Sequence, residues 1–144
     1  FSKAWEYAIK ATIFIAEQSL LERRVSQKEV AAAIQGPEAF TAKTLQKLAK
    51  SNVVSSMKGP GGGFFLTTKQ LQNIFLIHIV ESIDGLDQIK ACWLGLSSCN
   101  NDKPCPVHFQ YKVIKDGLLH MLSTTNIKDL ALDIKRGDTY LAHW

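Results

Sequence analysis

Val53-Val-Ser-Ser-Met-Lys-Gly-Pro-Gly-Gly-Gly-Phe-Phe-Leu-Thr67 is the stretch of sequence that decides the fold. Its flanks, residues 53–58 and 64–67, are prone to form strands, and only glycines and one proline lie between them. A nucleotide-binding phosphate loop would end in Gly-Lys-Ser or Gly-Lys-Thr and lead into a helix, whereas this run leads into a second strand. The stretch therefore predicts a β-hairpin with a glycine-rich tip.

Three helices are predicted ahead of this hairpin. Apolar side chains at three- and four-residue spacing predict a first helix over residues 3–17. Ser26 and Glu29 form a capping box that opens a short helix through Ile34, and residues 38–50 indicate a third helix. Helix, short helix, helix and hairpin is the order of a winged helix-turn-helix. The predicted fold class is therefore mainly α with a small β-hairpin.

The sequence after the hairpin predicts three more helices. Thr67 and Gln70 open one over residues 69–83, which backs the domain, and Asn126 opens a short last helix through residue 135. Between them, apolar residues step by four, three, four and three, which is the spacing of a heptad seam. The seam residues are Val107, Tyr111, Ile114, Leu118 and Met121. This spacing predicts a long helix that packs against a partner helix.

All three cysteines lie close together in the segment that precedes the long helix. Cys92, Cys99 and Cys105 are followed by His108, in the pattern C-x6-C-x5-C-x2-H, within a segment rich in loop-forming residues. Cysteines that only filled a core would be scattered along the chain. Soft ligands on a loop favour an iron–sulfur centre, although disulfide-bonded or inert thiols remain an alternative. The pattern lacks the C-x2-C pairs of zinc fingers and ferredoxins.

The composition places the chain among globular proteins and excludes several classes. At 144 residues, with 46% hydrophobic and 21% charged residues, it is one domain, or a small domain with an appended arm. No apolar run is long enough to cross a bilayer. An odd number of cysteines without a secretion signal predicts a cytoplasmic setting. The net charge of +4 is compatible with nucleic acid, and no acid–base pair or Ser/His/Asp set indicates an enzyme.

A winged helix-turn-helix would meet DNA through its third helix and its wing. The third helix enters the major groove with its first turns facing the bases, and basic side chains on the wing reach the minor groove or the phosphates. Thr41 and Thr44 are expected at base edges, and Lys47 and Lys58 at phosphates or groove charge. The complete set of predicted DNA contacts is Ser26, Gln27, Glu38, Thr41, Lys43, Thr44, Lys47, Lys58, Gly59 and Gly61.

The helix-turn-helix, the run Lys58-Gly-Pro-Gly-Gly-Gly-Phe-Phe-Leu66 and the three later cysteines together resemble the IscR and NsrR branch of the Rrf-type winged-helix regulators. The resemblance extends from residue 1 to about residue 134. It implies a homodimer that binds palindromic promoter DNA, most simply as a repressor, under the control of a bound iron–sulfur cluster. The implied domains are a DNA-binding domain over residues 1–84, a cluster-binding loop over 85–106, and a dimerisation helix with a short last helix over 107–144.

The resemblance also implies the cluster ligands, Cys92, Cys99 and Cys105. The fourth ligand falls on His108 in the IscR-like pattern, or on Glu6 of the partner subunit's first helix in the NsrR-like pattern. The expected cofactor is a 2Fe–2S cluster in preference to 4Fe–4S. A DNA-binding thiol switch without a metal is the alternative, and a small electron-transfer protein is a weaker one, because it would need no recognition helix or wing.

Overall fold

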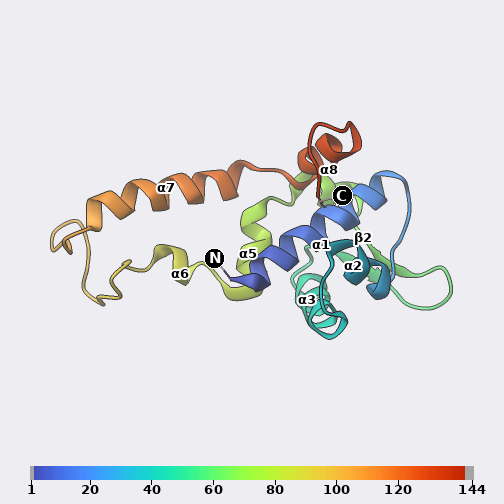
Figure 1. Cartoon of the computed structure of the whole chain (residues 1–144), viewed down its shortest axis with the longest axis horizontal. Coiled ribbons are helices and arrows are strands. Elements are labelled where there is room, and N and C mark those ends of the chain that lie inside the picture. The colour runs from blue at the N-terminus through green and yellow to red at the C-terminus, as the bar shows by residue number, and fades with distance from the viewer. Residues whose placement is uncertain (1, 142–144) are drawn as a thin grey trace.

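The computed structural model describes residues 2–141. A body and a projecting arm make up the molecule (Figure 1). The body contains α1 (Lys3–Leu20), α2 (Gln27–Ile34), α3 (Glu38–Lys50), β1 (Ser55–Met57), β2 (Gly63–Phe65), α4 (Thr68–Asn73), α5 (Leu76–Asp84) and α8 (Ile127–Lys135). The arm contains α6 (Asp87–Lys90), the loop that follows it and α7 (His108–Thr124).

Helix α1 forms the centre of the body, because its small and branched apolar residues allow other helices to approach it closely. Ala8, Ala11, Ile15 and Ala16 are fully buried, and α1 packs against α2, α3, α5 and α8. Although α8 follows the arm in sequence, it returns to the body, where Ile127 is fully buried. Figure 1 shows this return at the end of the chain.

The helix-turn-helix and its wing form as the sequence predicts. The capping box of Ser26 and Glu29 opens α2, and β1 pairs with β2 in antiparallel register, with Ser55 opposite Phe65. Val25 pairs with Phe64 on the other side of β2. A Cβ atom on Gly63 would lie 2.6 Å from the carbonyl oxygen of Val25, so only glycine permits this close approach.

The predicted helix over residues 69–83 is wrong, because the chain breaks it at Ile74 and Phe75. Both residues have extended backbone angles, which separate α4 from α5. Phe75 pairs with Asn126 across an isolated bridge, and the N–H of Leu76 donates to the carbonyl of Thr125 at 3.0 Å. The bridge ties the α4–α5 junction to the link between α7 and α8, a tertiary contact that overrides local helix preference.

The five predicted seam residues do not share one exposed face of α7. Leu118 packs against the core of the body, and the hydroxyl of Tyr111 donates to the carbonyl of Ile89 at 3.1 Å. Ile114 and Met121, in contrast, are 67% and 49% exposed. The five residues therefore do not form one continuous seam that is free to meet a partner helix, because one face of α7 already packs against α5 and α6 of the same chain. Val107, the remaining member, is half-buried as the N-cap of α7.

Candidate metal centre

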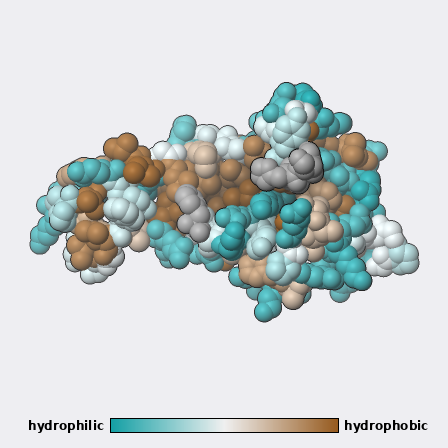
Figure 2. Space-filling view, in the orientation of Figure 1, coloured by the Kyte–Doolittle hydropathy of each residue, from teal (hydrophilic) through white to brown (hydrophobic). Residues whose placement is uncertain are grey.

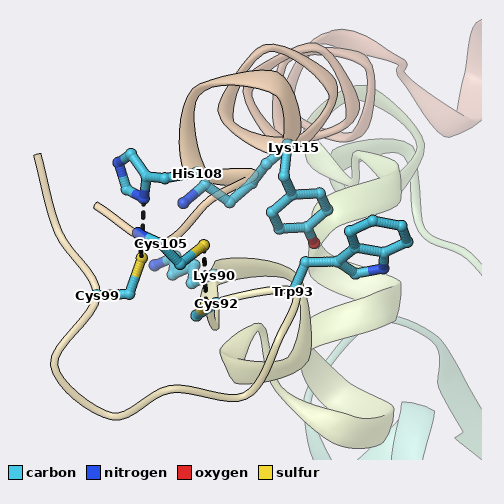
Figure 3. A pocket seen from close by; sticks show the side chains of 8 residues that line it. Lys90, Cys92, Trp93, Cys99, Cys105, His108 and Lys115 are labelled. Carbon is cyan, nitrogen blue, oxygen red and sulfur yellow. Dashed lines mark hydrogen bonds between the residues drawn. The ribbon is translucent and has the colours of Figure 1, made fainter.

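The loop of residues 91–107 connects α6 to α7 (Figure 1). The three cysteines converge in this loop (Figure 3). Their Sγ atoms all lie within 4.8 Å of one another, and those of Cys92 and Cys105 are 3.7 Å apart. Cys105 is buried, and Cys92 and Cys99 are half-buried. Three thiols at this separation can act as ligands to one metal centre.

Backbone N–H groups donate to each of the three sulfur atoms. Such bonds, led by that from the N–H of Leu96, lower the pKa of the Cys92 thiol to about 7. The N–H of Cys105 donates to the Sγ of Cys99 at 3.4 Å. Burial raises the pKa of the Cys105 thiol, although the N–H of Val107 partly opposes this effect. Hydrogen bonds to sulfur favour the thiolate, which is the form that binds a metal.

His108 lies beside the thiols with one ring nitrogen held by the loop. Its Nδ1 is 3.1 Å from the Sγ of Cys99, and its Nε2 is 2.9 Å from the Oδ1 of Asn101. Because an amide oxygen accepts hydrogen bonds, this contact places the ring proton on Nε2 and leaves the lone pair of Nδ1 facing the sulfur. Metal-binding histidines are commonly oriented in this way by a hydrogen bond from their second nitrogen.

Two lysines and two aromatic side chains complete the walls of the site. Lys90 from α6 and Lys115 from α7 line the cavity with the cysteines, and Figure 3 shows these side chains beside the sulfur atoms. Trp93 stacks on Tyr111, with ring centroids 6.1 Å apart. The cavity has a volume of about 30 Å³. Two positively charged side chains therefore line the same cavity as the three thiols.

The alternative fourth ligand, Glu6, has a different setting. It is exposed in the first turn of α1, and the Nζ of Lys3 lies 3.0 Å from its carboxylate. The hydrogen bond from Lys3 lowers the pKa of the Glu6 carboxyl. The group of described residues that could hold one metal contains the three cysteines and neither Glu6 nor His108. His108 contacts Cys99, whereas the predicted role of Glu6 would require a second copy.

The structure corrects the predicted base contacts on α3. Thr41 is fully buried and Thr44 is 4% exposed, so neither side chain faces solvent. Their hydroxyl groups donate to the carbonyls of Pro37 and Phe40, one turn earlier in the helix. The two threonines therefore belong to the inner face of α3, and the prediction that they contact base edges is wrong.

The other predicted DNA contacts are accessible to different degrees. Glu38, Lys43 and Lys47 are exposed on α3, as are Lys58, Gly59 and Gly61 on the wing. Gln27 is half-buried, and the hydroxyl of Ser26 accepts from the N–H of Glu29. Arg24, which the sequence reasoning missed, donates to the carbonyl of Gly61 at 3.3 Å and lies over the ring of Phe65. These contacts hold the tip of the wing.

Over residues 1–133 the sequence matches the Rrf2 family, described as iron-dependent transcriptional regulators. The chain belongs to the Rrf2 family. An HTH-type transcriptional regulator of Aquifex aeolicus is 33% identical over 132 residues, which make up 90% of each chain. IscR of Photorhabdus laumondii is 27% identical over 84 residues, 58% of this chain. That alignment spans half the length of the IscR protein.

Solved structures of Rrf2-type regulators share the fold. CymR of B. subtilis, described as a global cysteine regulator, superposes with a TM-score of 0.74 at 22% identity, over 92% of this chain and 95% of CymR. IscR of T. potens has the same TM-score at 19% identity, over 97% of this chain and 91% of that one. At such identities the likeness supports the fold alone, and it confirms the predicted mainly α, winged-helix class.

Several residues of this Rrf2 protein escaped the sequence reasoning. Asn101, which orients His108, carries no pattern of its own in a polar loop. Phe109 and Val113, which are 54% and 74% exposed, could have been found from a four-residue spacing that continues through Gly117 to Met121.

Among residues 2–141, no helix combines the length and apolar character needed to cross a membrane.

Proposed function

We propose that this Rrf2-family regulator is a homodimeric repressor whose operator binding depends on an iron–sulfur cluster held by Cys92, Cys99, Cys105 and His108. One observation carries the proposal: three thiols separated along the chain converge in a pocket whose N–H groups favour thiolates. We further propose that the body binds DNA, that the cysteine loop responds to the presence or absence of the cluster, and that α7 joins the two copies.

The donor set fits the chemistry of an iron–sulfur cluster. Three thiolates and an imidazole are known ligands of such clusters. The donors form two close pairs, Cys92 with Cys105 and Cys99 with His108. A 2Fe–2S cluster takes two protein ligands on each iron, and these four donors would supply that number, with the loop opening to admit the two irons and two sulfides. When bound, the cluster would supply a centre that changes with redox state and iron supply.

An exposed apolar stripe on α7 supports the homodimer. Phe109, Val113, Ile114 and Met121 are each about half exposed or more. Gly117 lies among them, and the position that a Cβ atom would take there faces open space. Figure 2 shows hydrophobic side chains gathered on the arm. A stripe of this kind is costly in water, and a glycine at its centre allows a second helix to approach closely.

Contacts between the loop and α7 provide a route from the site to DNA. Trp93 of the loop stacks on Tyr111 of α7, whose hydroxyl is bonded to Ile89 of α6. A change in loop geometry would therefore move α7 relative to the body. Since a dimer must space its recognition helices by about one turn of DNA, roughly 34 Å, a small shift of α7 would alter operator affinity.

The assignment of the ligands is tested by chemical analysis of anaerobically purified protein. The native chain should contain iron and sulfide and absorb visible light. Cys92→Ala, Cys99→Ala and Cys105→Ala should each lose this absorbance while the protein remains folded. His120→Ala serves as the control. His120 is exposed on α7, the helix that begins at His108, and its replacement should leave the cluster in place. Full iron and sulfide in all three cysteine variants would refute the assignment.

A thiol switch without metal is the second candidate, and the 3.7 Å between the Sγ atoms of Cys92 and Cys105 favours it. A peroxide would oxidise the Cys92 thiolate to a sulfenate, and Cys105 would then displace water to form a disulfide. This function predicts a metal-free native protein whose DNA affinity changes with peroxide. Cys99→Ala should leave that response intact, whereas it should abolish a response that depends on a cluster.

A further inference from the structure

We infer that Cys92, Cys99 and Cys105 form a site for a single tetrahedral Zn²⁺ ion that competes with the cluster, with His108, whose Nδ1 lies 3.1 Å from the Sγ of Cys99, as the fourth ligand. The inference rests on the proposed role of these residues as metal ligands, but it does not require that a cluster forms. It identifies zinc as a second metal that can bind to the same ligands.

The distances between the sulfur atoms fit one metal ion. Zinc–sulfur bonds are about 2.3 Å long, so two thiolates on one tetrahedral zinc stand about 3.8 Å apart. The Sγ atoms of Cys92 and Cys105 are 3.7 Å apart, and Cys99 lies within 4.8 Å of both. In a 2Fe–2S cluster, two irons and two sulfides must lie between the two ligand pairs. The observed spacing therefore suits a single ion better than a cluster.

The cavity lined by the cysteines, His108 and the two lysines has room for one ion. Its volume is about 30 Å³, and about 10–15 Å³ is enough to hold one water molecule. A larger occupant, such as the four atoms of a 2Fe–2S core, would need the loop to open. The loop can do so, because most of residues 91–104 are exposed to solvent.

The chemistry of the surrounding groups also suits zinc. His108 directs the lone pair of Nδ1 towards Cys99 while Nε2–H is held by Asn101. Zn²⁺ with three thiolates and a neutral imidazole carries one net negative charge, which Lys90 and Lys115 face from opposite helices. Three-cysteine, one-histidine sets are established ligands of structural zinc. The wide spacing of the cysteines in sequence does not prevent this, because the loop folds them together.

Cobalt provides a direct spectroscopic test on reduced, metal-free protein under anaerobic conditions. Titration with Co²⁺ should saturate at about one ion per chain, with thiolate-to-cobalt charge-transfer bands and the strong visible bands of tetrahedral cobalt. An equal amount of Zn²⁺ should remove these bands. X-ray absorption of the zinc form should show sulfur neighbours at about 2.3 Å and a nitrogen at about 2.0–2.1 Å.

Matched variants identify the ligands. Cys92→Ser, Cys99→Ser and Cys105→Ser should each weaken the cobalt charge-transfer bands, and His108→Ala should remove the nitrogen neighbour. His120→Ala should behave like the native chain. Octahedral cobalt, saturation well below one ion per chain, or unchanged bands in the cysteine variants would overturn the inference.

Assembly of a cluster is measured on the same preparation, so that the two proposals are judged separately. Protein that takes up iron and sulfide but gives no tetrahedral cobalt spectrum contradicts the zinc site and leaves the proposed function standing. Protein that binds zinc but never a cluster supports the zinc site and contradicts the proposed function. If both occupants bind, zinc-loaded protein should assemble a cluster only after a chelator has removed the zinc, and unhindered assembly would contradict the competition.

Discussion

His108 can serve as a ligand because a neighbouring side chain fixes its orientation. Asn101 accepts from Nε2–H, and this contact frees Nδ1 to face Cys99. The sequence shows that a histidine follows the third cysteine, but it does not show which nitrogen is available. That detail depends on a loop residue seven positions away, and only the folded loop brings the two together.

Replacing Asn101 tests this orientation. Asn101→Ala should weaken metal binding by about 10–100-fold, the usual effect of losing a partner that orients a ligand. Asn101→Asp keeps an acceptor oxygen and should retain most of the affinity, and Asn73→Ala, on the distant α4, should have no effect. Metal affinity is measured by competition with a chelator. If Asn101→Asp and Asn101→Ala lost metal affinity equally, the hydrogen bond between residue 101 and His108 would not determine that affinity.

The thiols should also differ in their response to pH. Backbone donors lower the pKa of Cys92 to about 7, whereas burial raises the pKa of Cys105 above its ordinary value of 9.0. Because the folded pKa of Cys92 is below that of the unfolded chain, its thiolate contributes stability above about pH 9 and loses it as the pH falls through 7.

Alkylation of the metal-free protein, followed by mass spectrometry, measures this difference. Cys92 should react at half its maximal rate near pH 7, and Cys105 should need a pH above 9. If the two residues were modified together with the same pH dependence, the hydrogen bonds assigned to Cys92 would be wrong.

At the scale of elements, local signals predicted most of the fold. Capping boxes at Ser26 and Thr67 both form, and the glycine-rich run forms the expected wing. The predictions failed where tertiary contacts decide the outcome. The break at Ile74 and Phe75 depends on pairing with a segment some fifty residues later. The burial of Thr44 was within reach of the sequence, because Thr44 lies at helical spacing with Leu48 on the inner face of α3, and the base-edge prediction conflicted with that spacing.

Two substitutions on α7 separate the face that packs inside the chain from the face proposed for the dimer. Ile114→Glu places a charge on the exposed stripe and should give folded monomers with nearly native thermal stability. Leu118→Glu places the same charge against the core and should cost on the order of 2–3 kcal/mol of folding free energy. Ser123→Glu, on the polar side of α7, is the control. Sedimentation and thermal unfolding measure both effects, and an intact Ile114→Glu dimer would place the interface elsewhere.

At the scale of the whole molecule, exposed lysines of α3 and the wing should form one DNA-binding face. Lys43→Ala, Lys47→Ala and Lys58→Ala should each weaken binding to every sequence and reduce the log–log salt slope by roughly one unit. Lys112→Ala, which removes an ion pair with Asp116 on the arm, should leave the slope unchanged. A salt titration on specific and scrambled duplexes measures the affinity and the slope. Slopes equal to that of the native protein in all three variants would show that this face does not bind DNA.

The central claim is that the occupant of the cysteine site controls DNA binding, and one titration tests it most directly. A duplex is selected from a random-sequence pool with anaerobic, cluster-loaded protein, and its affinity is measured by fluorescence anisotropy before and after the cluster is removed. Iron and sulfide are quantified in each sample. The cluster-loaded protein should bind about 5–150-fold more tightly, the usual range of allosteric coupling. Equal affinity of the two forms for the selected duplex would contradict the account.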